Sequence, residues 1–346
     1  MPLRAAKLAA VGAAATALVG ASAATAGGPP PPTSHNGNKP HLVASGLGTP
    51  TAFAFGGGAV FESDAGTQAA DTPLSNSPIT RSKRTAAVPG GVYLLSHGTA
   101  KRLSGSPPVS FGIVWHNGTL YVSALNKLLA WSGWNGKKFT KQRVFYTAPK
   151  NFPGFNGLGF GANGRLYVGV DVGETNDHAP ATAPFQYDFL SFSTSGGKPQ
   201  VVAKGIRQPW QMAFPAGSNS PYVSDLGQDS GAKNPPDFVL RIKAGQNYGF
   251  PKCNWTAAWK CNAFARPFRF FSPHTDVMGE AIAGKRLYMT DFGAGSVPPQ
   301  VNSMPLSGGK VKPLLTGFVA PVVGLGIHGG QLYVGELTGQ VWRVKL

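Results

Sequence analysis

The fold follows from a pattern that is fullest in Gly205–Cys261, which reads GIRQPWQMAFPAGSNSPYVSDLGQDSGAKNPPDFVLRIKAGQNYGFPKCNWTAAWKC. Two apolar runs, Trp210–Phe214 and Pro221–Leu226, flank a turn of Gly, Ser and Asn, which predicts a β-hairpin. A third strand is expected over Phe238–Lys243. An aromatic-rich loop with two cysteines follows it and lies beside Arg207. A rigid loop next to a charged strand entrance is where a ligand site is commonly built.

The hairpin is one of six copies of a unit in which a short apolar strand, a tight turn and a second strand, often Leu-Tyr-Val, follow one another. The copies lie at Thr51–Ser63, Phe111–Ser123, Gly157–Asp171, Trp210–Asp225, Met278–Asp291 and Val323–Glu336. Two more strands are expected between copies, for example Phe189–Thr194 and Gln200–Lys204. Four antiparallel strands recurring every ~40–50 residues are typical of propeller blades, so we predict an all-β, six-bladed β-propeller over residues 39–346.

The two ends of the chain are expected to meet in one blade. Lys198–Pro209 and Lys312–Pro321 read as outer strands that end a blade, and Lys39–Pro50 carries the same Lys-Pro phrase. The last strand, Gly339–Val344, is only the third of its blade. Residues 39–46 should therefore supply the missing fourth strand of the last blade, which would remove a free sheet edge.

The N-terminus is typical of an export signal. Arg4 and Lys7 precede an apolar run rich in Ala and Val, and an Ala-x-Ala site ends at Ala26. Residues 1–26 are therefore predicted to be a secretory signal peptide, and the mature protein to be secreted. A membrane anchor is the alternative, but the run is short and Ala-rich for a span, and no later segment could cross a membrane. Residues 27–38, GGPPPPTSHNGN, are expected to be a flexible linker.

The chain is strongly basic, with 31 Lys and Arg against 14 Asp and Glu and a net charge of +17. This charge serves solubility or attracts an acidic partner, such as an anionic cell-wall polymer or a polycarboxylate ligand. Nucleic acid is not expected, because no recognition motif accompanies the charge. Cys253 and Cys261 are the only cysteines. In an exported chain they predict a disulfide, since a metal site would need more ligands than lie nearby.

Three phrases carry a family resemblance: GLGFGANGRLYVGVD at 157–171, GIRQPWQMAF at 205–214, and KAGQNYGFPKC at 243–253. They resemble the soluble quinoprotein glucose/sorbosone dehydrogenases. That resemblance covers roughly residues 40–346 and implies a secreted six-bladed propeller that oxidises sugars with pyrroloquinoline quinone and Ca²⁺. The Asn-Tyr-Gly-Phe-Pro phrase with its cysteines is the most specific part.

The resemblance also implies site residues. Arg207 and Gln208 match an arginine and a polar residue that face the quinone, with Gln where Asn is usual. Backbone carbonyls that hold calcium match Gly227, Gln228 and Tyr248. Asp237 matches an acidic residue near that calcium. Because carbonyl ligation does not depend on the side chain, the changed side chains are compatible with a calcium site.

The sequence departs from the family at the catalytic base. The family's base is a histidine, and its place is taken by Pro153. A base must have a pKa near neutrality and lie within hydrogen-bond reach, which proline cannot provide. His178 and His274 are the candidates to replace it, unless they are ordinary loop histidines. A family arginine that pairs with the quinone carboxylates corresponds to Ala320-Pro321, and a further cation is missing from Asp291–Gly295.

Two functions stay open on this evidence. The first is a secreted dehydrogenase of a sugar or related alcohol that uses pyrroloquinoline quinone and Ca²⁺. The second is a non-catalytic secreted binding propeller that kept the scaffold and a calcium site, and whose ligand is a small sugar, an alcohol or an anion. The fold does not decide between them.

Overall fold

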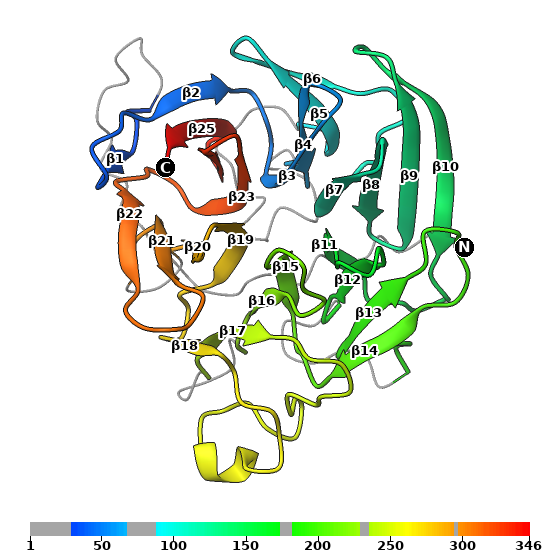
Figure 1. Ribbon diagram of the computed structural model, residues 1–346, viewed down its shortest axis with the longest axis vertical. Helices are drawn as coiled ribbons and strands as arrows, with labels where there is room; N and C mark the ends of the chain where they lie inside the picture. Colours follow the sequence, from blue (N-terminus) through cyan, green and yellow to red (C-terminus); the bar gives the residue numbers. More distant parts are fainter. Residues whose placement is uncertain (1–28, 68–87, 174–181, 229–234, 294–296) are drawn as a thin grey trace.

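The computed structural model describes residues 29–67, 88–173, 182–228, 235–293 and 297–346. The described residues form antiparallel sheets that stand as six blades around a central axis (Figure 1). One short 3-10 helix, η1 (Ala258–Cys261), lies on an excursion outside the ring. The predicted all-β, six-bladed propeller is confirmed. The predicted signal peptide and His178 lie outside the described residues.

Each blade runs from an inner strand beside the axis to an outer strand at the rim. The strands are β3 (Pro50–Gly56), β4 (Ala59–Asp64), β5 (Gly91–Ser96) and β6 (Thr99–Arg102) in blade 1; β7 (Gly112–His116), β8 (Thr119–Ala124), β9 (Lys127–Trp134) and β10 (Phe139–Thr147) in blade 2; β11 (Phe155–Phe160), β12 (Leu166–Val170), β13 (Asp188–Phe192) and β14 (Gln200–Lys204) in blade 3; β15 (Pro209–Ala213), β16 (Tyr222–Asp225), β17 (Asp237–Arg241) and β18 (Arg269–Phe271) in blade 4; β19 (Val277–Ala283), β20 (Arg286–Asp291), β21 (Gln300–Pro305) and β22 (Lys312–Thr316) in blade 5; and β23 (Val322–His328), β24 (Gln331–Glu336), β25 (Gln340–Lys345) and β2 (His41–Ala44) in blade 6.

The ring closes through the N-terminal strand, as predicted. β2 pairs antiparallel with β25, with His41 opposite Arg343 and Leu42 opposite Trp342. The first and last parts of the chain therefore share blade 6. This pairing gives the outer edge of β25 a partner, so that backbone groups at that edge are hydrogen-bonded.

The segment expected to be a linker is partly ordered into the sheet. β1 (Thr33–Ser34) pairs with β22 and adds a fifth strand to blade 5. Asn36 and Asn38 then donate side-chain hydrogen bonds to the carbonyl of Lys345, at 2.9 and 3.1 Å. The linker prediction is corrected for these residues. Composition did not show this, because the partners lie about 280 and 310 residues away along the chain.

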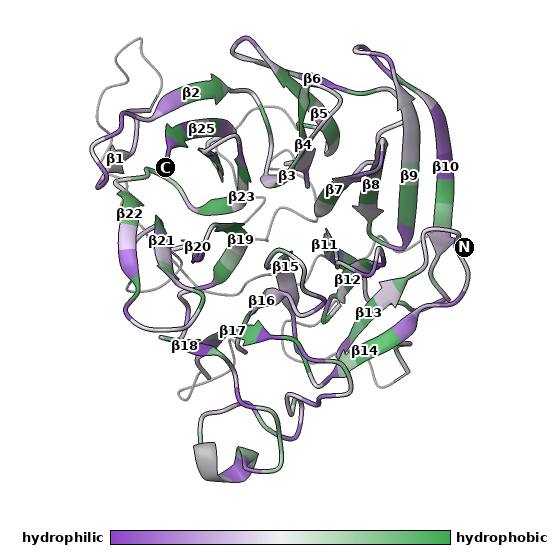
Figure 2. Ribbon diagram, viewed as in Figure 1, coloured by the Kyte–Doolittle hydropathy of each residue, from purple (hydrophilic) through white to green (hydrophobic). Residues whose placement is uncertain are grey.

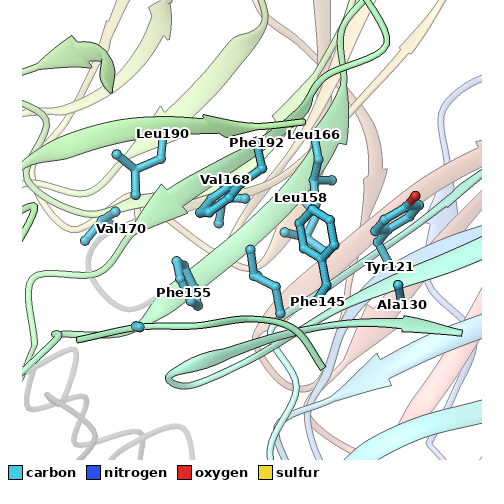
Figure 3. Close-up of a cluster of buried hydrophobic side chains, with 12 residues drawn as sticks. Tyr121, Ala130, Phe145, Phe155, Leu158, Leu166, Val168, Val170, Leu190 and Phe192 are labelled. Carbon is cyan, nitrogen blue, oxygen red and sulfur yellow. The ribbon is translucent and has the colours of Figure 1, made fainter. Parts of the chain in front are cut away.

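The hydrophobic core is divided among the blade interfaces. Each pair of neighbouring blades shares its own cluster of buried apolar side chains. Figure 3 shows the cluster between blades 2 and 3, where Tyr121, Ala130 and Phe145 face Phe155, Leu158 and Leu166. Figure 2 shows hydrophobic residues along most strands and hydrophilic ones at the turns. Strand alternation therefore places apolar residues on both faces of each blade, as packing on two sides requires.

The inner strands approach one another closely around the axis, which requires small residues. Glycine stands at this point in four blades, at Gly112, Gly157, Gly279 and Gly324. A Cβ at Gly157 would lie 2.5 Å from the carbonyl oxygen of Trp210, and one at Gly279 would lie 2.5 Å from that of Val323. Any larger residue at these positions would push the blades apart.

Blade 4 has Gln211 at the same position of its repeat. Its side-chain Nε2 donates to the carbonyl of Phe111 in blade 2, at 2.8 Å, and to that of Thr51 in blade 1, at 3.2 Å. Gln211 therefore crosses the axis and ties three blades together. The repeat contains a signal for this role, because blade 4 has a long polar residue at a position where the other blades have a small one. Sequence analysis missed this signal.

Carboxylates at the ends of second strands fix the segments that lead into the inner strands. Asp64 accepts hydrogen bonds from the backbone amides of Gly48 and Thr49, and Glu336 accepts from those of Val319 and Ala320. These bonds hold in place the face of the propeller that carries the loops leading into the inner strands, which we call the loop-rich face. Within the described part of the chain, no helix is long and apolar enough to cross a membrane.

Candidate functional site

The predicted cofactor and calcium residues come together at the loop-rich end of blade 4. One pocket there is lined by Gly205, Arg207, Asp225, Leu226, Gly227, Gln228, Pro235, Phe238, Leu240, Tyr248, Phe250, Cys253, Asn254, Trp255 and Pro267. Arg207, Gly227, Gln228 and Tyr248 are thus neighbours, and Gln208 is buried beside them. Residues that the sequence singled out far apart along the chain therefore share one place in the fold.

Arg207 is the centre of the pocket and is 3% exposed. Its Nη1 donates to the carbonyl oxygens of Gly227, at 2.6 Å, and Leu226, at 2.9 Å. It also donates to Oε1 of Gln208, at 3.1 Å. The guanidinium therefore hydrogen-bonds to the Gly227 carbonyl, which is one of the carbonyls that the resemblance assigned to calcium.

Two carboxyls, those of buried Asp225 and half-buried Asp171, interact electrostatically with this cation. Burial raises the pKa of Asp225 to about 7, while the amide of Gln208 and the Arg207 guanidinium both act to lower it. Burial also raises the pKa of Asp171, and Arg207 is again among the groups that lower it. Arg207 thus favours the ionised form of both carboxyls.

Asp237 organises the next layer of the site. Its carboxylate accepts from the amide of Gly227 at 2.7 Å and from the amide of Asp276 at 2.8 Å. The pKa of Asp291 is raised to about 7, mainly by burial and also by the nearby charge of Asp237, while hydrogen bonds from Gln300 and Asn302 act to lower it. Asp237 therefore acts as an anchor for two loops, through both carboxylate oxygens.

The loop closed by the two cysteines forms the outer wall of the pocket. The predicted disulfide between Cys253 and Cys261 is present, with a Cα–Cα distance of 5.4 Å. Asn254 Nδ2 donates to Oε1 of Gln228 at 3.1 Å, and Trp255 Nε1 donates to the carbonyl of Tyr248 at 3.4 Å. Donors from this loop are therefore directed at the pocket.

A calcium ion does not fit this arrangement. The free space in the pocket is about 10 Å³, roughly what one water molecule needs. The Gly227 carbonyl is bound by a cation, and the Tyr248 carbonyl faces an indole N–H. Among the described residues, no group of three or more His, Cys, Asp or Glu side chains is placed to hold a metal ion.

Among the described residues, neither Pro153 nor His274 places a base in the pocket, and His178 lies outside them. Pro153 lies in the segment just before β11, as the sequence indicated. His274 precedes β19 in a left-handed conformation, with φ of 60°, and is not among the residues that line the pocket. Near Ala320, where the family has an arginine, the backbone amide donates instead to the Glu336 carboxylate.

An apolar cluster joins blades 2, 4, 5 and 6 at this end of the propeller. It is formed by Phe111, Trp210, Leu226, Met278, Phe292 and Val323. Leu226 also lines the Arg207 pocket, so the two features adjoin. Sequence analysis missed this cluster, although the apolar residues at the starts of the inner strands, such as Trp210 and Met278, were a usable signal.

Comparison with known proteins identifies solved structures that share this fold. No protein-family profile matches the chain, and no curated protein matches it. A structure from Thermus thermophilus, described as an oxidoreductase and glucose dehydrogenase, is 18% identical with a TM-score of 0.70, over 89% of this chain and 100% of that one. The PQQ-bound aldose sugar dehydrogenase of Streptomyces coelicolor is 17% identical with a TM-score of 0.65, over 90% and 99%.

A fungal enzyme shares the same architecture. A Trichoderma reesei protein of carbohydrate-active enzyme family AA12 is 16% identical with a TM-score of 0.72, over 91% of this chain and 98% of that one. At these identities the likeness establishes the fold, and the site must be argued from its own residues. This chain is therefore similar, over nearly its whole propeller, to the six-bladed soluble sugar dehydrogenases.

Proposed function

We propose that this chain is a secreted carbohydrate-binding propeller that has the fold of the soluble sugar dehydrogenases without their quinone chemistry. The carbohydrate class comes from the structural relatives, which are named as sugar dehydrogenases and as a carbohydrate-active enzyme. The observation that carries the proposal is the buried Arg207 guanidinium bound to the Gly227 carbonyl at 2.6 Å.

Electrostatics disfavours calcium beside this arginine. At an effective dielectric constant of about 20, a divalent ion about 4 Å from the guanidinium is repelled by roughly 8 kcal/mol. The carbonyls would have to offset this repulsion while giving up the hydrogen bonds that Arg207 makes. Arg207 therefore takes the place of the metal as the cation of the site.

Proline at position 153 removes the base as well. A peptide-bonded proline nitrogen carries no proton-accepting lone pair, so it cannot abstract a hydroxyl proton. With Pro153 in place of the family's histidine and the Gly227 carbonyl bound by Arg207, the Arg207 pocket lacks both the base and the metal through which that family oxidises sugars.

The test uses the mature chain from residue 27. Pyrroloquinoline quinone and Ca²⁺ are added while the quinone absorbance and dye-linked oxidation of aldoses are followed, and a glycan array measures binding. We expect retention on glycans, no turnover, and a melting temperature unchanged by Ca²⁺ or chelator, since only a ligand of the folded state raises it. Turnover, or failure to bind any glycan, would contradict the proposal.

A quinone- and calcium-dependent sugar dehydrogenase is the second candidate. It is favoured by the convergence of Arg207, Gly227, Gln228 and Tyr248 on one pocket. It requires Arg207 to leave the Gly227 carbonyl when cofactors bind. In the same experiment, saturable quinone binding with turnover that is lost in Arg207→Met would establish this candidate in place of the first.

A further inference from the structure

A second, larger depression lies on blade 4 and shares Tyr248 with the Arg207 pocket. It is lined by Arg241, Lys243, Gln246, Tyr248, Ala265, Arg266 and Phe268 and has a volume of about 390 Å³. We call these residues the basic groove. Its volume falls in the range of about 300–1,000 Å³ that small-molecule sites have, whereas the Arg207 pocket admits about one water.

The basic groove carries three cations and no carboxylate. Arg241, Lys243 and Arg266 are exposed, and no Asp or Glu is among the lining residues. Three like charges around one depression repel one another unless an anion lies between them. The arrangement therefore favours an anionic ligand with more than one charge.

Both guanidinium groups are held in place by aromatic rings. The Arg241 guanidinium lies 5.8 Å from the ring centroid of Tyr222, and that of Arg266 lies 5.4 Å from the ring centroid of Phe270. Cation–π contacts of this kind leave the N–H groups available for another partner. The entropy lost when these side chains bind a ligand is correspondingly reduced.

The walls of the groove are rigid. The Tyr248 hydroxyl donates to the carbonyl of Arg241 at 2.6 Å and accepts from the amide of Lys243 at 3.1 Å. The opposite wall is joined to it where the amide of Ala265 donates to the carbonyl of Asn247 at 2.8 Å. Figure 1 shows that this wall belongs to the excursion that leaves blade 4 and carries η1. The spacing of the cations is therefore largely set before a ligand arrives.

We propose that the basic groove binds a segment of an acidic polysaccharide through its carboxylate groups. The planar guanidinium matches a carboxylate with two parallel hydrogen bonds, and two such groups with a lysine suit successive acidic sugars. Phe268, which is half-buried, supplies apolar contact area for a sugar ring. The overall charge of +17 draws such a polymer to the surface.

The sugar part of this inference rests on the proposed carbohydrate binding, whereas the anion binding rests on the groove alone. Binding of polygalacturonate by the mature chain is measured by calorimetry at about 0.15 M salt, where surface charges more than ~8 Å apart are screened. Its methyl ester is the uncharged probe on the same backbone, and polyphosphate is the anionic probe without sugar. Glycan-array binding of neutral sugars is measured in parallel.

The decisive variant is the groove triple Arg241→Gln, Lys243→Gln and Arg266→Gln. Its matched control, with the same charge change on exposed residues of blades 1 and 2, is Lys101→Gln, Lys137→Gln and Lys138→Gln. We expect the groove triple to weaken polygalacturonate binding at least tenfold and the control less than twofold. Because all six residues are exposed, both triples should fold, which circular dichroism checks.

Each other outcome overturns a definite part of the inference. Equal weakening by both triples would show attraction to net charge only. Equal binding of the methyl ester would exclude carboxylate recognition, and tighter binding of polyphosphate through the groove would make the ligand a phosphate polymer. Absence of polygalacturonate binding with neutral glycan binding intact would refute the groove alone, whereas absence of all glycan binding would refute the proposed function.

Discussion

Replacing Arg207 by Met tests whether the arginine is the cation of the site. Methionine keeps most of the length and apolar volume of the side chain but removes the charge and the donors. The variant leaves the carbonyls of Leu226 and Gly227 without the donor that now lies 2.9 and 2.6 Å away. It also removes the positive charge that acts on Asp225 and Asp171.

The expected loss depends on pH in a direction that follows from Asp225. Two buried acceptors left without a donor cost about 1–3 kcal/mol each, so a loss of ~3 kcal/mol is expected at pH 5, where Asp225 is protonated. The folded-state pKa of Asp225 is raised to about 7, and removing Arg207 raises it further. Above pH 7 the variant therefore loses more stability than at pH 5, by about 1.4 kcal/mol for each unit by which the pKa of Asp225 rises.

The assay is urea unfolding of the chain from residue 27 at pH 5 and pH 8. Arg102→Met is the matched control, because Arg102 also donates to backbone carbonyls, those of Gly90, Ser106 and Pro107. Arg102 acts electrostatically on Tyr93, whose pKa burial raises to about 12, so this titration lies outside the measured range. The control should lose similar stability at both pH values.

Two results would refute the reasoning. A loss below ~1 kcal/mol at both pH values would mean that Arg207 does not satisfy the carbonyls. A loss that is larger at pH 5 than at pH 8 would mean that the guanidinium is not coupled to Asp225 and Asp171.

Four further outcomes are expected. The unfolding free energy should fall as pH rises from about 4 to 7, because the folded-state pKa of Asp291 is raised to about 7 and the folded chain then holds a proton that the unfolded chain has released; urea titrations of the wild type and Asp291→Asn measure this, and a rising slope would contradict it. Changing Cys253 and Cys261 to Ser should cost ~2–3 kcal/mol by thermal or urea unfolding; an unchanged midpoint would count against it. Gln211→Ala should cost about 2–4 kcal/mol, since two buried carbonyls lose their donor; calorimetry checks this, and a loss near zero would deny the bridge. Deleting residues 39–46 should expose the edge of blade 6 and cause aggregation in light scattering; a monodisperse, equally stable product would contradict the closure.

The sequence by itself determined the architecture of this protein. Strand-turn-strand units are local, so alternating apolar residues and turn pairs such as Asn117-Gly118 identify them without knowledge of their neighbours. Their sixfold repetition and the Lys39–Pro50 phrase then predicted the blades and the closure by β2. The cysteine pairing was also correct, because only two cysteines exist.

The chemistry of the site was decided by the tertiary structure. The family resemblance implied that Arg207, Gly227 and Tyr248 lie in one site, but it could not show that the guanidinium itself binds the Gly227 carbonyl. Hydrogen bonds of this kind depend on the direction and burial of side chains. The spacing of residues along the chain does not reveal either of these. Gln211 likewise acquires its role only when closure of the ring brings the carbonyls of blades 1 and 2 to the axis.

The basic groove has the same origin. Arg241 and Arg266 are 25 residues apart in the sequence, and neither stands in a recognisable motif. They face one depression because the excursion that carries the disulfide folds back to β18 beside β17. Sequence determines local strands and turns because those depend on neighbouring residues, whereas a site depends on which surfaces the closed ring brings together.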